Sequence, residues 1–154
     1  MPTIVECIRD AILDELPELE ALQRRASMVW EEYRDQLTEH PDAIVIPRDD
    51  IEDHRTRVAC GSGRRMGFSV VLAIRDGVCE LDGLFVEPEC WRRGAGRALI
   101  DDVVANAIRA DASSLEVTAN PRAVAFYEAL GFRGGVLVPT RFGPGLRMQR
   151  ILRA

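Results

Sequence analysis

The sequence predicts an α/β (α+β) fold with a central mixed, mostly antiparallel sheet of seven strands and about four helices. Three observations lead to this prediction. Three strand-like segments follow one another in the middle of the chain, a glycine-containing loop then leads into an amphipathic helix, and the chain ends in a hairpin pattern. Since 154 residues can bury one core without metals or disulfides, we expect a single domain, residues 1–154.

The first third of the chain predicts one strand and two helices. The segment "TIVECIRDAI" is rich in β-branched and apolar residues, which favour a strand. Asp14 can then cap a helix through "ELPELEALQRRASMVW". A second, short helix over "EEYRDQLTEH" stops at Pro41, because proline cannot continue a helix.

The middle of the chain predicts an antiparallel meander of three strands. The segment "RVACGSGRRMGFSVVLAI" contains two strands around the turn "GSGRR". The turn "RDG" then leads into the third strand, "VCELDGLFV", which ends before Pro88.

The glycines of "ECWRRGAGRALI", residues 89–100, lie between this strand and a helix. The helix has apolar residues at spacings of three and four, namely Leu99, Ile100, Val103, Val104 and Ile108. The strand "SLEVTA" follows, and the strand–helix–strand step predicts a parallel pair.

The rest of the chain predicts a helix and a hairpin. The helix begins near Pro121, runs through "RAVAFYEAL" and closes with Gly131 in the C′ position. The segments "FRGGVLVPT" and "LRMQRIL" then form a hairpin joined by "RFGPG".

Composition excludes several classes of protein. The apolar content of 47% with 29% charged residues is that of a soluble globular protein, and no apolar run approaches the roughly 20 residues that span a bilayer. The start "MPTIVECIRD" does not look like a signal peptide, so a cytoplasmic location is expected. A net charge of −5 argues against nucleic-acid binding. The four cysteines form no CxxC motif and there are only two histidines, so no metal site is expected.

The glycine loop predicts an anion site, because a helix N-terminus exposes unpaired N–H groups and the positive end of the helix dipole. Two phosphate-binding designs fail here. A Walker A loop needs a lysine, and the chain contains none. The dinucleotide fingerprint needs a third glycine, where this chain has Leu99.

A third design is the pyrophosphate loop of the GNAT acyltransferases, and here the chain resembles a known family. The family's "[QR]-x-x-G-x-[GA]" motif fits residues 91–96, with Trp91 in place of the polar first residue, or residues 93–98 as "RGAGRA". We prefer the first register, which keeps free amides at Gly96 and Arg97. The segment "VTANPRAVAFYEALGF" is similar to the family's "N-x-x-A-x-x-[FL]-Y-x-x-x-G-F". The resemblance covers nearly the whole chain and is least specific in the N-terminal third.

The resemblance implies acetyl-CoA as co-substrate. Its pyrophosphate would accept hydrogen bonds from loop amides, its pantetheine arm would pair with the backbone at the end of the strand before the loop, and Gly83 would mark a bulge there. The expected cofactor-binding residues are Leu84, Phe85, Val86, Arg92, Arg93, Gly94, Ala95, Gly96, Arg97, Asn120, Ala123 and Phe126.

The resemblance also implies two catalytic residues. Tyr127 would be the general acid that protonates the leaving thiolate, although a tyrosine that only packs fits the same position. Glu80, fourteen residues before Gly94, would be the general base. It shares a strand face with Asp82, and two carboxylates on one face would raise each other's pKa. The alternative is that both carboxylates are solvated or hold a cationic substrate.

The acceptor is not encoded in a recognisable motif. Candidates for its pocket are Trp30, Tyr33, Asp82 and Arg141. We expect transfer of acetyl to a primary amine of a small molecule by direct attack. Two alternatives remain, a protein or peptide N-terminal acetyltransferase and a catalytically inactive CoA-binding protein. The oligomeric state is left open, with a homodimer as one alternative.

Overall fold

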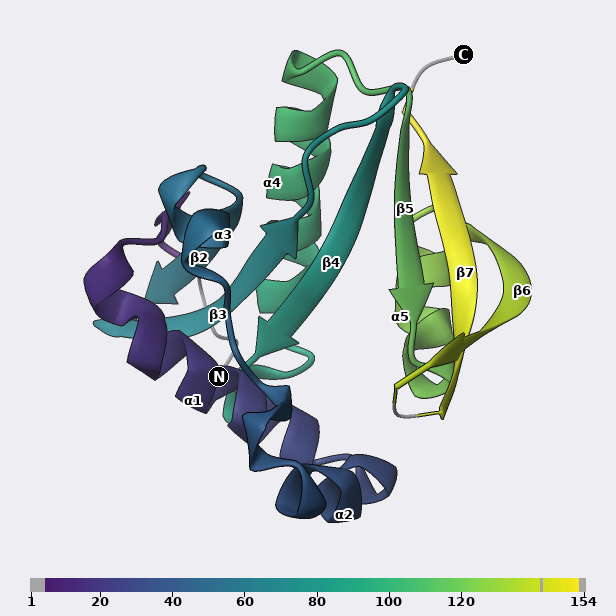
Figure 1. The fold of residues 1–154 in the computed structure, drawn as a ribbon. Coiled ribbons are helices and arrows are strands. Elements are labelled where there is room, and N and C mark those ends of the chain that lie inside the picture. Colours follow the sequence, from purple (N-terminus) through teal and green to yellow (C-terminus); the bar gives the residue numbers. More distant parts are fainter. Residues whose placement is uncertain (1–4, 142, 153–154) are drawn as a thin grey trace. The chain divides into compact units, whose positions relative to one another are not determined.

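The structure is a computed structural model that describes residues 5–141 and 143–152. Its seven strands follow the order β1-β2-β3-β4-β5-β7-β6 in one sheet (Figure 1). The pairs β1–β2, β2–β3, β5–β7 and β6–β7 are antiparallel, and β4 and β5 are parallel. The predicted mixed, mostly antiparallel sheet is therefore confirmed, including the parallel step.

The chain divides into two compact units. The first takes the residues up to Val70 together with Gly83–Asp102, and the second takes Val71–Asp82 together with the residues from Val103 onward. Strand β4, Val78–Val86, and helix α4, Ala95–Arg109, each contribute residues to both units.

The first unit begins with β1, Cys7–Asp10, and a 3₁₀ turn, Leu13–Glu15, that leads into α1, Leu16–Met28. The predicted strand covered residues 3–12 and was too long, since residues 5, 6, 11 and 12 lie outside β1. Residues 3 and 4 lie outside the described part of the chain. The predicted cap at Asp14 is wrong. Glu15 holds the N-cap position of α1, and its carboxylate accepts a hydrogen bond from the Ile12 amide at 3.0 Å.

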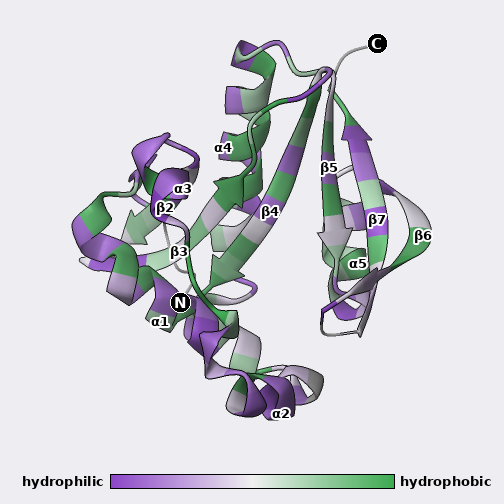
Figure 2. Cartoon of the chain, viewed as in Figure 1, coloured by the Kyte–Doolittle hydropathy of each residue, from purple (hydrophilic) through white to green (hydrophobic). Residues whose placement is uncertain are grey.

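Helix α2, Glu31–Glu39, lies where it was predicted and is drawn mostly in the purple of hydrophilic residues in Figure 2. A further helix, α3, Arg48–Glu52, brings the α-helices of the described residues to five. The sequence did not predict α3, because five residues are too short to show a helical period.

Strands β2, Thr56–Gly61, and β3, Arg64–Val71, form the predicted hairpin across Ser62 and Gly63. Their apolar residues and those of α1 form one core. This core contains Ala11, Leu19, Leu22, Ile46, Ile51, Val58, Phe68 and Val70.

The second unit contains β5, Ser114–Ala119, and α5, Val124–Ala129, which follows a 3₁₀ turn over Pro121–Ala123. Gly131 has a φ of +92°, as expected for a C′ glycine. The final hairpin is formed by β6, Arg133–Thr140, and β7, Gly143–Ile151.

This hairpin is tighter than predicted. Thr140 pairs with Gly143, so most of the predicted loop "RFGPG" belongs to β7, and its Phe142 lies outside the described residues. A Cβ on Gly145 would lie 2.6 Å from the Thr118 side chain, so glycine is required there by a close strand contact rather than by a loop. None of the described helices combines the length and apolar character needed to cross a membrane.

Candidate functional site

The glycine loop of the first unit has two residues with left-handed backbone. After the 3₁₀ turn Pro88–Cys90, Arg92 has a φ of +61° and Gly94 a φ of +92°. Helix α4 then begins at Ala95, and its first hydrogen bond runs from the Ala98 amide to the Gly94 carbonyl at 3.0 Å. The amides of Ala95, Gly96 and Arg97 precede this bond, so they have no partner within the helix. A helix N-terminus of this kind can bind an anion, and anion binding at this loop stays a prediction.

The donors of this loop fit a pyrophosphate. Gly94 and its two chain neighbours aside, no heavy atom of the described residues lies within 4 Å of the place where a Cβ on Gly94 would stand, so the backbone can be approached closely there. The side chains of Arg92, Arg93 and Arg97 are exposed and add positive charge. Backbone amides at a helix N-terminus, open space and guanidinium groups are together suited to the phosphates of acetyl-CoA.

The loop is fixed at both ends by burial. Met66, Cys90 and Ala95 form a buried cluster against which Val86 packs. At the start of the loop, the Glu87 amide donates to the Met66 carbonyl at 2.8 Å. The two ends of the loop are therefore attached to the same apolar cluster.

The Glu87 side chain is also anchored. This side chain is 7% exposed, and its two oxygens accept hydrogen bonds from Arg25 of α1 at 2.8 and 2.9 Å. Arg64 of β3 adds a contact at 3.3 Å. A buried carboxylate satisfied by two arginines ties the loop to both elements.

Trp91 is the residue at which the chain departs from the family motif, and the structure gives it a local role. Its indole N–H donates to the Val86 carbonyl at 2.8 Å. Its ring lies 5.4 Å from that of Trp30, measured between centroids, with 30° between the ring planes. Trp30, which was expected to line an acceptor pocket, thus contacts the glycine loop.

Near the end of β4, the Phe85 side chain packs against the core of the first unit. Phe85 packs against Phe68 with 5.3 Å between ring centroids. A Cβ on Gly83 would lie 2.7 Å from the Phe85 ring, so this glycine makes room for that ring. Leu84 and Val86 are half-buried. A pantetheine contact with these three residues stays a prediction, and the Val86 carbonyl already has a partner.

In the second unit, Glu80 is paired with an arginine that the sequence did not single out. Arg147 of β7 donates to the two Glu80 oxygens at 2.6 and 2.9 Å. The same guanidinium donates to Glu116 at 3.1 Å and to Thr118 at 3.0 Å. We call Glu80, Glu116, Thr118 and Arg147 the Arg147 cluster.

The Arg147 cluster changes the expected environment of Glu80. A guanidinium contacts Glu80. The expected influence of the neighbouring Asp82 carboxylate on Glu80 stays a prediction. The hydrogen bond to Glu80 also raises the pKa of Arg147. Strand register explains the contact, since Glu80 pairs with Glu116 and Thr118 with Arg147. Glu80 and Arg147 are 67 positions apart in the sequence, so no local pattern could predict their contact.

Tyr127 is 7% exposed and lies among aromatic rings. It makes edge-to-face contacts with Phe126 and Phe132, with ring centroids 5.1 and 5.3 Å away. Burial raises the pKa of the phenol well above its usual value, so the hydroxyl keeps its proton at neutral pH. Packing and proton donation are both compatible with this position.

The remaining cofactor-binding candidates of the second unit differ in hydrogen bonding and exposure. The Asn120 side chain accepts a hydrogen bond from the Arg122 amide at 2.8 Å and so caps the 3₁₀ turn before α5. Ala123 is half-buried, and Phe126 is 37% exposed. Cofactor binding by these three residues stays a prediction.

The four acceptor candidates are divided between the units. Trp30 and Tyr33 belong to the first unit, and Asp82 and Arg141 to the second. Tyr33 is half-buried on α2, whereas Asp82 and Arg141 are exposed. Their role in acceptor binding stays a prediction.

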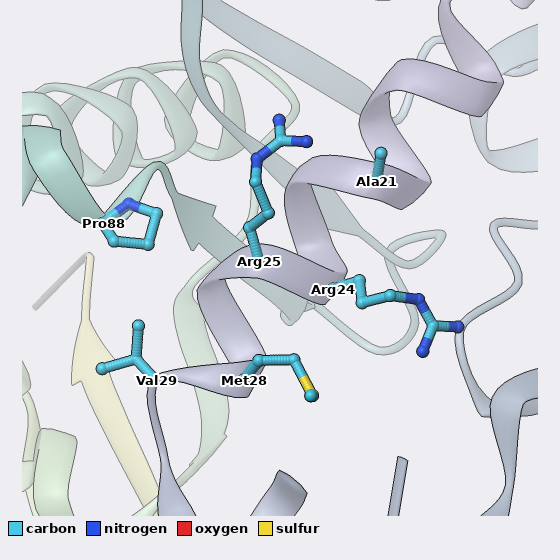
Figure 3. Close-up of a pocket in the computed structure, with 6 residues that line it drawn as sticks. All are labelled: Ala21, Arg24, Arg25, Met28, Val29 and Pro88. Atoms are coloured by element: carbon cyan, nitrogen blue, oxygen red, sulfur yellow. The ribbon is translucent and has the colours of Figure 1, made fainter. Parts of the chain in front are cut away.

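The first unit also has an open hollow beside α1, shown in Figure 3. Its two arginines are engaged elsewhere, since Arg25 holds Glu87 and Arg24 donates to the Pro41 carbonyl at 2.8 Å. None of the residues proposed for the acceptor lines it. The lining residues are Ala21, Arg24, Arg25, Met28, Val29 and Pro88.

Comparison with known proteins gives a family and a fold. The model of the acetyltransferase (GNAT) family matches residues 14–132. No curated protein matches the chain. A GCN5-related N-acetyltransferase from Rhodopseudomonas palustris has a similar structure, with a TM-score of 0.77, 17% identity and 98% of both chains covered.

Two further solved structures share the fold. The ribosomal-protein-S18-alanine N-acetyltransferase from Escherichia coli has a TM-score of 0.70 at 20% identity, covering 96% of this chain and 94% of its own. The N-acetylglutamate synthase from Neisseria gonorrhoeae, complexed with coenzyme A and N-acetyl-glutamate, has a TM-score of 0.71 at 17% identity. That match covers 96% of this chain and 35% of the synthase.

Proposed function

Because the chain belongs to the acetyltransferase (GNAT) family, which uses acetyl-CoA, we propose that it acetylates the primary amine of a small molecule by direct attack. The observation that carries this proposal is that the second unit contains both a candidate general base and a candidate general acid. Glu80 is an accessible carboxylate, and Tyr127 is a phenol that keeps its proton. An acid and a base are what amine acetylation requires. We also propose that the whole chain acts as one domain.

The first unit would hold acetyl-CoA, which supplies the acetyl thioester. The amides of Gly94 through Arg97 would donate to the pyrophosphate, with Arg92, Arg93 and Arg97 at its rim. The backbone of Leu84, Phe85 and Val86 in β4 would face the pantetheine arm. Most of this recognition is by backbone, so the loop conformation matters more than any one side chain.

Tyr127 would donate a proton to the departing thiolate. A phenol carries its proton at neutral pH even at its usual pKa of about 10, and burial raises the pKa of Tyr127 further, which makes it a weaker acid. The aromatic contacts with Phe126 and Phe132 fix the ring in one orientation. A fixed donor avoids the entropic cost of orienting a mobile one.

Glu80 would accept the proton of the incoming ammonium, directly or through water. Both of its oxygens are bonded to Arg147, so one must exchange that partner for the substrate or a water molecule. The Glu80 side chain is 32% exposed, so water can reach it. Arg147 would then keep the carboxylate oriented through the other oxygen.

The acceptor class is the open part of the proposal. Trp30, Tyr33, Asp82 and Arg141 are our candidates for acceptor recognition. One structural neighbour is named for acetylating alanine of a ribosomal protein, and another contains N-acetyl-glutamate, but at 20% and 17% identity both are evidence for the fold alone. Transfer to a protein N-terminus, the alternative left open by the sequence, stays the second candidate function.

A screen of thiol release from acetyl-CoA tests the proposal. The panel contains small primary amines, amino acids and peptides with free N-termini, and the Glu80→Gln and Tyr127→Phe variants serve as controls. We expect at least one small amine to release thiol, and both variants to lose most of that rate. Release with peptides alone supports the second candidate. CoA binding without release by any amine supports an inactive CoA-binding protein and contradicts the enzyme proposal.

A further inference from the structure

The chain has two tryptophans, and they contact each other. Trp30 follows α1 and is the N-cap residue of α2, whereas Trp91 lies between the 3₁₀ turn Pro88–Cys90 and the glycine loop. Both side chains are half-buried. An aromatic contact of this kind fixes the position of each ring more firmly than apolar burial alone does.

The indole N–H of Trp91 has a specific partner. It donates to the carbonyl of Val86, the last residue of β4, at 2.8 Å. A half-buried indole without an acceptor would lose its hydrogen bond to water, so this bond selects one rotamer of the ring. The chain from Val86 to Trp91 is thereby closed into a loop of fixed shape.

This fixed shape matters because the backbone of the next residue, Arg92, is strained. Arg92 has a φ of +61°, which costs a residue with a Cβ about 1–2 kcal/mol. Such a conformation persists only where the surroundings hold it. The Arg92 side chain is exposed, so the buried side of the loop must provide the restraint. Trp91 is the residue directly before it.

We infer that Trp91 is a positioning residue for coenzyme A. Its N–H···O=C bond to Val86 and its contact with Trp30 hold Arg92 and Gly94 in the left-handed conformation that presents the amides at the start of α4. The inference rests on the proposed placement of the pyrophosphate at this loop. It assigns to a tryptophan side chain a role that the family motif gives no reason to expect.

A matched pair of variants separates the hydrogen bond from the ring contact. Trp91→Phe keeps an aromatic ring but removes the N–H, whereas Trp30→Phe keeps both the ring contact and the Trp91 donor. The affinity of the full-length protein for CoA is measured by calorimetry. Loss of one hydrogen bond corresponds to a roughly 2- to 12-fold weaker Kd in Trp91→Phe. Trp30→Phe should stay within about twofold of the wild type.

Three further measurements test for a merely structural role. The CoA fragments ADP and pantetheine are used as competitors of CoA, and Trp91→Phe should weaken ADP, which carries the pyrophosphate, but not pantetheine. In Trp30→Phe, Trp91 is the sole source of indole fluorescence, and its emission should change with CoA at the calorimetric Kd. Urea unfolding of both variants measures whether their stabilities differ.

The outcomes distinguish the inference from the proposed function. If the wild type binds no CoA, the proposed function fails, and the inference fails with it. If the wild type binds CoA and Trp91→Phe matches Trp30→Phe in Kd, the inference alone is overturned. Equal weakening of ADP and pantetheine also overturns it, because a general loss of structure would act on both fragments.

Discussion

The two units use arginine–carboxylate pairs differently. In the first unit Glu15 and Glu87 are 2% and 5% exposed, and each carboxylate is held by two arginines. In the second unit the Glu80 and Glu116 side chains are 32% and 23% exposed and share the single Arg147. These two carboxylates of the first unit are therefore buried, whereas those that Arg147 holds are open to solvent. The first unit also has an exposed pair, Glu89 with Arg64, which serves as a control below.

This difference separates groups that hold structure from groups that can react. A buried carboxylate has exchanged water for arginine, and removing one partner leaves an uncompensated charge, which costs about 3–5 kcal/mol. A half-exposed pair contributes only about 0–1 kcal/mol, because water replaces either partner at little cost. For the same reason, substrate or water can reach Glu80 but not Glu15.

The strongest test of this comparison is Glu80→Gln. Loss of a general base lowers kcat by roughly 10²- to 10⁴-fold, and the free energy of unfolding should change by less than about 1 kcal/mol. Steady-state kinetics with the best amine of the screen and urea unfolding measure the two effects. A pH–rate profile identical to that of the wild type would remove Glu80 from the mechanism.

The opposite result is expected for Glu15→Gln, which should lower the free energy of unfolding by about 1.5–3 kcal/mol, because hydrogen bonds to a buried charged group are weakened. The reason is that Arg9, at 2.7 and 2.8 Å, and Arg65 lose a charged partner within the unit. Glu89→Gln is the matched control, because Glu89 is 58% exposed and pairs with Arg64 at 2.5 Å. The control should cost less than about 1 kcal/mol. Equal destabilisation by the two variants would contradict the comparison.

The Glu15 pair also predicts a pH dependence of stability. Hydrogen bonds from Arg9 lower the pKa of the Glu15 carboxyl to about 2. An unfolded glutamate has a pKa near roughly 4.3, so the stabilisation is complete above that pH and is lost as the pH falls toward 2. Urea unfolding at several acidic pH values should show a steeper loss in the wild type than in Glu15→Gln. Parallel curves for the two proteins would be evidence against this assignment.

The sequence predicted element bounds that follow from local patterns, and it missed side-chain contacts between segments that are far apart in the chain. The bounds of β4 and β5 and the helix start after the glycine loop follow from short patterns, and all were predicted. Arg147 and the Trp91 indole bond were missed, because each depends on strand register or on a side chain from another segment. Trp91 departs from the family motif in the sequence, and the structure shows what its side chain contacts. It donates a hydrogen bond to Val86 and packs against Trp30.

Within the first unit, we expect CoA binding to depend on the backbone conformation of the glycine loop more than on the charge of its side chains. Gly94→Val tests this, because a φ of +92° is strained for a residue with a Cβ even though the surrounding space is open. A cost of about 1–2 kcal/mol corresponds to a roughly 5- to 30-fold weaker Kd for CoA. Gly96→Ala is the control, since Gly96 lies within α4, where alanine is favoured. Calorimetry on both variants measures the difference.

The smallest effect is expected for Arg97→Ala. Arg97 is exposed in the first turn of α4, so its attraction to a pyrophosphate is screened by solvent and contributes about 0.2–1 kcal/mol, or roughly a 1.4- to 5-fold change in Kd. That contribution should shrink as salt rises, because the Debye length falls from roughly 10 Å at 0.1 M to 3 Å at 1 M. The Gly94→Val penalty should remain at high salt, since backbone strain is not screened. CoA affinities at the two salt concentrations therefore separate charge from backbone, and an Arg97→Ala loss that exceeds the Gly94→Val loss would reverse the order proposed for this loop.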